Sequence, residues 1–313
     1  MKKRISRFIL ALGLGLLNQS FAFAESTIIA DREVRPIEVV VNGEFIKMDV
    51  HPLMDKNHLY VPIRALASLG LSYSFNPSTK ITTVQNKDGD YLKLSVNSTT
   101  AYKNEKPIQM DMPAQNKNGR ILVPLRFISE SLGYNVQFES IRKFVFINSQ
   151  DYTFDPNLLY QDDLQAARKA AIALPINVDF KTLGTFDGYR LHQYSFPVGR
   201  ADTYFFNDGI FTFVQIIDGK AIAIGQLFRE RREPSQAAGN VSPEMSLDTD
   251  PIMEPYNYGN VIFFDYTDGT ARAGYTDDNN KRVDIETKMN IYSDIIQKLP
   301  DHRYGRYKIG RDR

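Results

Sequence analysis

The chain has 313 residues, of which 42% are apolar, so it is long enough and apolar enough for two ordinary domains with packed cores. Its formal charge is only +1. It contains no cysteine, which excludes disulfides, thiolate metal sites, catalytic thiols and lipid-modified cysteines.

The first 24 residues are typical of an export signal. Four cations precede an apolar run over residues 8–17, and Ala22-Phe23-Ala24 supplies the small residues that a signal peptidase reads. We expect cleavage after Ala24. An uncleaved anchor is the alternative, but a membrane helix needs about 20 apolar residues and no later run is that long. We therefore expect an extracytoplasmic protein (periplasmic, secreted or on the cell surface) with no transmembrane segment after cleavage.

Cleavage would also change the charge balance. It would leave 34 Lys and Arg residues against 37 Asp and Glu, a formal charge of −3. This balance gives no bulk attraction to nucleic acid or to an anionic membrane, so nucleic acid is not an expected partner.

After a polar lead-in over residues 25–36, two stretches of the chain match each other at an offset of 62 residues. The matches are Asn42 with Asn104, Ile46 with Ile108, Met48-Asp49 with Met110-Asp111, and Val61-Pro62-Ile63-Arg64 with Val123-Pro124-Leu125-Arg126. The offset then becomes 63, and Leu69-Gly70 and Phe75 match Leu132-Gly133 and Phe138. These matches predict a tandem duplication.

Each copy is expected to begin with a hairpin. Residues 37–41 and 44–50 flank Asn42-Gly43, which suits a turn with two positive φ angles. The second copy, residues 99–112, has Asn104-Glu105 at the same place, so we expect a different turn type there. Residues 51–57 and 113–120 read as polar loops.

Each copy then continues with a short apolar strand, a helix and two more strands. Pro62 and Pro124 suit the first turn of a helix, and Gly70 and Gly133 suit a left-handed residue at its end. The strands that follow are residues 71–75 and 80–85 in the first copy, and 134–138 and 143–148 in the second.

This pattern, over residues 37–149, resembles the copper amine oxidase N-terminal domain, or stalk domain, of exported bacterial proteins. The resemblance implies a small α+β domain with an antiparallel sheet curled around short helices. Phe75 and Phe138 stand where the family usually has Trp. The acid that follows is kept as Glu139, but it is Asn76 in the first copy.

Residues 150–300 have a different composition and predict a second α+β domain of unknown family. We expect a helix over residues 162–174, strands over 185–228 with a hairpin at Asp218-Gly219, and a long mobile loop over 229–258. A hairpin over residues 261–275 and a final helix over 285–299 follow, and then a basic tail over 301–313.

The name of the resembled family raises the question of oxidase activity. Copper amine oxidases hold copper with three histidines and mature a tyrosine within Asn-Tyr-Asp or Asn-Tyr-Glu. This chain has only His51, His58, His192 and His302, with none paired at metal-ligand spacing, and its Asn257-Tyr258 precedes a glycine. We therefore expect no amine oxidase activity and no cofactor.

Arg64 and Arg126 occupy the same place in both copies and allow two interpretations. They could bind an anion at a helix N-terminus. Alternatively, each could clamp a carboxylate of its own copy, such as Glu139, and hold helix to sheet. Repetition within the fold favours the structural role for Pro62, Arg64, Gly70, Pro124, Arg126, Gly133 and Glu139.

Two clusters have oxygen or imidazole ligands, but neither predicts a metal site. His51 and His58 flank a loop with Asp49 and Asp55, and their spacing of seven places them on no common face. Residues 277–280 begin like a calcium loop but lack its glycine and later glutamate, so a simple turn is expected.

For a hydrolase, Ser195 is near His192, but no nucleophile elbow surrounds the serine and neighbours in one strand alternate between faces. Asp187 and Asp202 are acids of loops without a recognisable partner. The lack of Trp weakens the hypothesis of glycan binding but does not exclude it, because 17 Tyr and 20 Phe are present.

These observations lead to two hypotheses. In the first, the protein is an exported, non-catalytic cell-envelope protein with a stalk-like scaffold and a C-terminal binding domain, and its partner is an unidentified envelope protein or polysaccharide. In the second, the C-terminal domain is an envelope hydrolase.

Overall fold

The structure is a computed structural model that describes residues 37–47, 52–184, 192–230, 233–243, 261–267, 270–277, 281–289, 295–299 and 301. The predicted signal peptide and lead-in, Asp49, His51, Asp187 and the tail after residue 301 lie outside the described residues.

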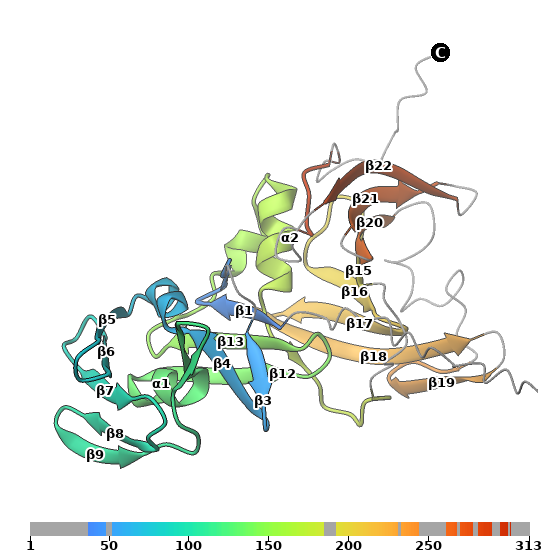
Figure 1. Cartoon of the computed structure of the whole chain (residues 1–313). Helices are drawn as coiled ribbons and strands as arrows, with labels where there is room; N and C mark the ends of the chain where they lie inside the picture. The colour runs from blue at the N-terminus through green and yellow to red at the C-terminus, as the bar shows by residue number, and fades with distance from the viewer. Residues whose placement is uncertain are drawn as a thin grey trace, which may run out of the picture. The chain divides into compact units, whose positions relative to one another are not determined.

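The first part of the chain forms three sheets and two short helices (Figure 1). Its first half comprises β1 (Glu38–Val41), β2 (Glu44–Phe45), β3 (Leu53–Asp55), β4 (His58–Pro62), the 3-10 helix η1 (Ile63–Leu69), β5 (Ser72–Asn76), β6 (Ile81–Gln85) and β7 (Tyr91–Ser95). Its second half comprises β8 (Thr100–Lys103), β9 (Lys106–Gln109), β10 (Gln115–Lys117), β11 (Arg120–Pro124), α1 (Leu125–Ser131), β12 (Tyr134–Glu139) and β13 (Phe144–Ser149).

Strands from the two halves are shared among these sheets. The strand orders are β12-β13-β1-β2, β10-β11-β4-β3 and β5-β6-β7-β8-β9. All pairings within them are antiparallel except β1 with β13. The arrangement agrees with the predicted α+β class, and the strands of this part are divided among three sheets.

The central sheet joins the two halves through β4 and β11. In this antiparallel pair Val61 lies opposite Val123, Tyr60 opposite Pro124 and Pro62 opposite Leu122. Val61 and Val123 match in the sequence at an offset of 62, so the register has local twofold symmetry about them. Both side chains are buried.

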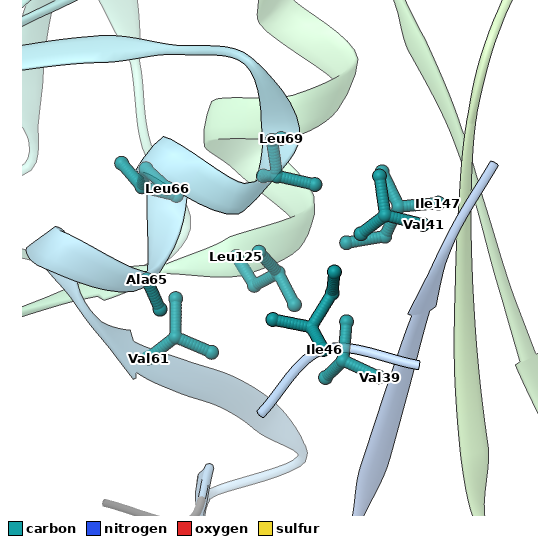
Figure 2. Close-up of a pocket in the computed structure, with 9 residues that line it drawn as sticks. All are labelled: Val39, Val41, Ile46, Val61, Ala65, Leu66, Leu69, Leu125 and Ile147. Carbon is teal, nitrogen blue, oxygen red and sulfur yellow. The ribbon is translucent and has the colours of Figure 1, made fainter. Parts of the chain in front are cut away.

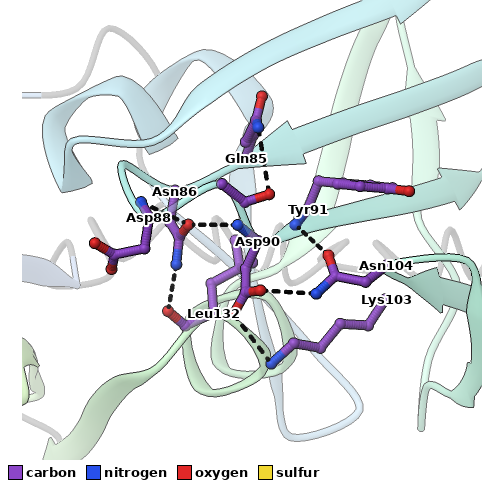
Figure 3. Close-up of polar contacts among 9 residues, drawn as sticks. Gln85, Asn86, Asp88, Asp90, Tyr91, Lys103, Asn104 and Leu132 are labelled. Atoms are coloured by element: carbon purple, nitrogen blue, oxygen red, sulfur yellow. Dashed lines mark hydrogen bonds and ion pairs between the residues drawn. The ribbon is translucent and has the colours of Figure 1, made fainter.

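The hairpin turns correct one prediction. Asn42 and Gly43 take positive φ angles of 46° and 81°, as expected, but Asn104 and Glu105 do so too, with 48° and 66°. The turn forms without a glycine at position 105 because side-chain contacts hold it. The Glu105 carboxylate accepts a hydrogen bond from the Tyr91 hydroxyl and is paired with Lys93. The Asn104 side chain accepts from the Tyr91 N–H and donates to Asp90 (Figure 3).

The predicted polar loops are also wrong in part, because they contain strands β3 and β10. β3 pairs with β4, and β10 pairs with β11. The turns between them place Lys56-Asn57 and Asn118-Gly119 at positive φ, which folds each polar segment back onto its neighbour.

The two helices begin one residue later than predicted. Pro62 and Pro124 have extended ψ angles of 136° and 109°, so each proline ends a strand instead of entering the first turn. The expected glycines lie at the helix ends: Gly70 has a φ of 72° and Gly133 a φ of 89°. A left-handed residue turns the chain into the next strand at both places.

The core of the first part is aliphatic. Figure 2 shows side chains from β1, β4, η1, α1 and β13 facing one another around a space of about 10 Å³. Such a space is too small and too apolar for a ligand or a hydrogen-bonded water. We interpret it as a packing imperfection.

The second part contains the 3-10 helix η2 (Pro156–Tyr160), the helix α2 (Leu164–Ile172) and one large sheet. α2 lies within the helix expected over residues 162–174, and Asp163 caps it by accepting hydrogen bonds from the N–H groups of Gln165 and Ala166. The sheet strands are β14 (Ile176–Asn177), β15 (His192–Pro197), β16 (Thr203–Asn207), β17 (Ile210–Ile217), β18 (Lys220–Glu230), β19 (Glu233–Gly239), β20 (Val261–Thr267), β21 (Thr270–Thr276) and β22 (Arg282–Met289).

The hairpins β17–β18 and β20–β21 confirm the prediction, and β16 falls within the strands expected over residues 185–228. Two other expectations fail in this sheet. Strand β19 lies inside the predicted loop over residues 229–258 and pairs with β18. The predicted helix over residues 285–299 is wrong, because β22 pairs along β21 and residues 295–299 are not helical. The edge of β21 gives the backbone of this segment the hydrogen-bond partners that a helix would otherwise provide.

Candidate functional site

The repeated arginines do not clamp Glu139. Arg126 and Arg64 are exposed second residues of their helices. The Nε atom of Arg126 lies 3.7 Å from the Oε1 atom of Glu130, one turn further along α1, and both side chains are more than half exposed. The clamp between Arg126 and Glu139 is therefore a wrong prediction, and such an exposed pair adds little stability.

Glu139 instead binds Arg142, and both residues are buried. Its carboxylate accepts hydrogen bonds from the backbone N–H and from Nε of Arg142, at 2.7 Å and 2.6 Å. Burial lowers the pKa of Arg142, but the carboxylate of Glu139 together with Tyr204 and Tyr194 outweighs this effect, so the net pKa is raised.

Arg142 also joins the two parts of the chain. Its Nη1 and Nη2 atoms donate to the backbone oxygens of Ile172 and Leu174, at 2.6 Å and 2.7 Å. These oxygens lie at the C-terminal end of α2, where a cation is favoured. Sequence reasoning singled out Glu139 but missed its partner three residues later.

A second hollow among the described residues lies beside α1. We call it the α1–β12 groove. It has a volume of about 440 Å³. Its apolar lining comes from distant elements and includes Met54, Met112, Phe127, Val136 and Phe138. Its polar lining is Asn57, His58, Asp111, Arg126 and Glu130.

The polar groups lie at the rim of the groove. Asp111 is 92% exposed, and its Oδ2 atom lies 4.0 Å from Nε2 of His58. Glu130 and Arg126 are the ion pair on α1. Two carboxylates and one guanidinium therefore surround an apolar floor, which is an arrangement suited to binding rather than to proton transfer.

The matching positions in the first half of the repeat region carry different residues. Ala65 and Ser68 stand where the groove has Phe127 and Glu130. Phe75 matches Phe138, and their exposed fractions, 43% and 44%, are nearly the same. The apolar floor and acidic rim are thus a property of one side of the repeat region.

The structure does not bring the hydrolase candidates together. His192, Tyr194 and Phe196 alternate along β15, and the His192 ring lies 6.5 Å from the ring of Phe206 in the core. Ser195 lies between two of these residues in the same strand, so its side chain points to the other face of the sheet. Asp202, the other described candidate, is bound by Arg200 at 2.9 Å.

A buried acid that the sequence analysis missed lies on the same face as Ser195. Asp265, on β20, is 1% exposed, and Arg282 and Arg272 form ion pairs with it. Burial raises the pKa of its carboxyl, and the two arginines oppose this increase. Its position directly after the apolar run Ile262-Phe263-Phe264, inside a predicted strand, was the available signal.

Among the described residues, no group of three His, Cys, Asp or Glu side chains could hold a metal ion. The suspected calcium loop is a turn at its described ends, where the Lys281 N–H donates to the Asp277 carboxylate at 2.8 Å. No described helix has the length and hydropathy needed to cross a membrane.

Comparison with known proteins identifies the first part of the chain. Residues 40–147 match the family model of the copper amine oxidase N-terminal domain, in agreement with the resemblance over residues 37–149. A comparison with curated proteins gave no match. The matched domain is a non-catalytic one. Residues 40–147 of this chain are therefore a copper amine oxidase N-terminal domain.

Proposed function

We propose that the protein is an exported, non-catalytic component of the cell envelope. Its stalk-like domain over residues 37–149 is a tandem duplication that acts as a scaffold and interaction module. Residues 150–300 form a binding domain for an envelope protein or polysaccharide. The export signal over residues 1–24 supports the location.

Backbone geometry supports the duplication. The left-handed pairs 42–43 and 56–57 recur 62 residues later at 104–105 and 118–119. Lys80 and Lys143, with φ angles of 57° and 59°, match at the later offset of 63. A non-glycine residue with positive φ is uncommon, so its recurrence at the same offsets favours a common origin.

The observation that carries the binding function is the α1–β12 groove. It is a hollow of about 440 Å³, lined by both apolar and polar side chains, in a domain whose family is non-catalytic. Concave apolar sites with a few polar groups at the rim are typical of binding surfaces.

Export and binding can be tested on the full chain in a bacterial host. We expect the protein in the extracytoplasmic fraction, with an N-terminus at Glu25 by mass spectrometry. We also expect the purified chain to retain a defined envelope component from solubilised cell envelopes. An uncleaved cytoplasmic protein, or no retained component, would contradict the proposal.

The alternative is an envelope hydrolase whose C-terminal domain is catalytic. The placement of Ser195 and Asp265 on one face of the sheet favours it, whereas His192 lies on the other face. Ester and peptide substrates provide a direct assay. Turnover that Ser195→Ala abolishes would establish the alternative.

A further inference from the structure

We propose that the α1–β12 groove binds an extended peptide, which adds as a strand to the free edge of β12. In this peptide, apolar side chains alternate with basic ones. The inference rests on the proposed function as an interaction module and names the class of partner.

The free edge of β12 provides the backbone contacts. β12 is the terminal strand in the order β12-β13-β1-β2, and it pairs with β13 from Tyr134 opposite Ser149 to Glu139 opposite Phe144. In the part of the chain that the structure describes, no strand pairs with its other edge. A row of unpaired N–H and C=O groups is a template for a further strand.

The groove provides places for alternate side chains. Val136 and Phe138 are two residues apart on β12, so both point to the face that lines the groove. Every second side chain of an added strand would point to this same face. Phe138 is 44% exposed, and Met54, Met112 and Phe127 complete an apolar floor. Methionine side chains adapt to apolar groups of different shape.

The rim selects the charge of the partner. Asp111 is 92% exposed, and Glu130 is 55% exposed although paired with Arg126. The carboxylates outnumber the guanidinium, so the rim attracts cations and repels acids. Exposed charges of this kind change selectivity and association rate more than affinity.

The experiment uses the full chain and a labelled synthetic octapeptide, acetylated and amidated, in which Lys alternates with Val and Phe. Fluorescence anisotropy measures binding. We expect saturable binding that weakens with salt. A peptide with Glu in place of Lys should bind much more weakly, and N-methylation of alternate amides should abolish binding.

Two pairs of variants locate the site. Phe138→Ser should weaken binding by about tenfold, the effect of losing roughly 1.4 kcal/mol of apolar contact. Phe75→Ser, at the matching position, should leave binding unchanged. Glu130→Lys should weaken binding of the Lys peptide, whereas Asp162→Lys, an exposed acid outside the groove, should not. Circular dichroism confirms that each variant is folded.

Three results would overturn the inference: no saturable binding, equal binding of the Glu peptide, or an equal loss with Phe75→Ser. A separate measurement, retention of the envelope component, distinguishes failure of this inference from failure of the proposed function. If Phe138→Ser retains the envelope component as well as the wild type does, the groove inference fails and the interaction module remains.

Discussion

The buried pair of Glu139 and Arg142 makes a strong prediction about stability. Arg142→Met removes a guanidinium that donates to Glu139, Ile172 and Leu174. The methionine fills much of the same volume but cannot donate. Glu139, which is 5% exposed, then keeps only the backbone N–H of residue 142 as a hydrogen-bond partner among the described residues.

Breaking a buried ion pair by removing one partner costs about 3–5 kcal/mol, because the other charge stays buried without compensation. The two backbone oxygens of Ile172 and Leu174 also lose their charged donors. We therefore expect Arg142→Met to lower the free energy of unfolding by about 4 kcal/mol, a large share of the roughly 5–15 kcal/mol of a typical domain.

Urea denaturation followed by circular dichroism measures this loss. Arg126→Met is the matched control, because its pair with Glu130 is exposed, and its cost should be under about 1 kcal/mol. Adding Glu139→Gln to Arg142→Met should restore part of the stability, since the amide oxygen still accepts from the backbone and carries no charge. Equal costs for Arg142→Met and Arg126→Met, or no recovery in the double variant, would refute the reasoning.

Three further predictions concern other sites. Gly70→Val should cost about 1–3 kcal/mol from backbone strain alone, because φ is 72° and no atom lies within 4 Å of the added Cβ; an unchanged melting temperature would contradict the left-handed helix end. Asp265→Asn should alter the pH dependence of unfolding. The raised pKa of the Asp265 carboxyl stabilises the folded state at low pH, so wild-type stability relative to the variant should fall as pH rises above 3.8; a constant difference would argue against a raised pKa. The fragment 25–150 should fold but bind a hydrophobic dye, because it exposes Phe144 and Phe146 of the core shared with the second part; a disordered spectrum would place the domain boundary elsewhere.

Local signals were enough to predict much of the first domain. Turn residues, helix ends and the matches at offsets 62 and 63 are encoded by neighbouring residues. Strands β3 and β10 were missed because they are short and polar. They exist because a neighbouring strand and a tight turn complete their hydrogen bonds.

Tertiary context decided the elements that sequence reasoning got wrong. The spacing of Ile285 and Met289 suits one face of a helix. The segment instead forms strand β22, because the edge of β21 was open for pairing. The groove could not be predicted either, since its lining comes from β3, β4, α1, β12 and the segment after β9. Glu139 was singled out correctly, but its buried partner depends on where α2 ends.

The two halves of the repeat region complete each other. The Tyr134 hydroxyl donates to the Leu69 oxygen at 2.9 Å. The Asn86 side chain donates to the Leu132 oxygen at 3.4 Å, as Figure 3 shows. Leu69 and Leu132 are the matching residues before the two helix-ending glycines. Under the proposed duplication, each copy thus caps the helix of the other.

This reciprocity has a consequence for binding. Because Val61 and Val123 share one strand pair and the helix ends are capped across the halves, each half depends on contacts from the other. Exposed positions outside these contacts are then free to diverge between copies. Two such differences lie at the groove: the second half has Phe127 and Glu130 where the first half has Ala65 and Ser68. A duplicated scaffold of this kind can keep its stability in the shared core while one side alone acquires a binding surface.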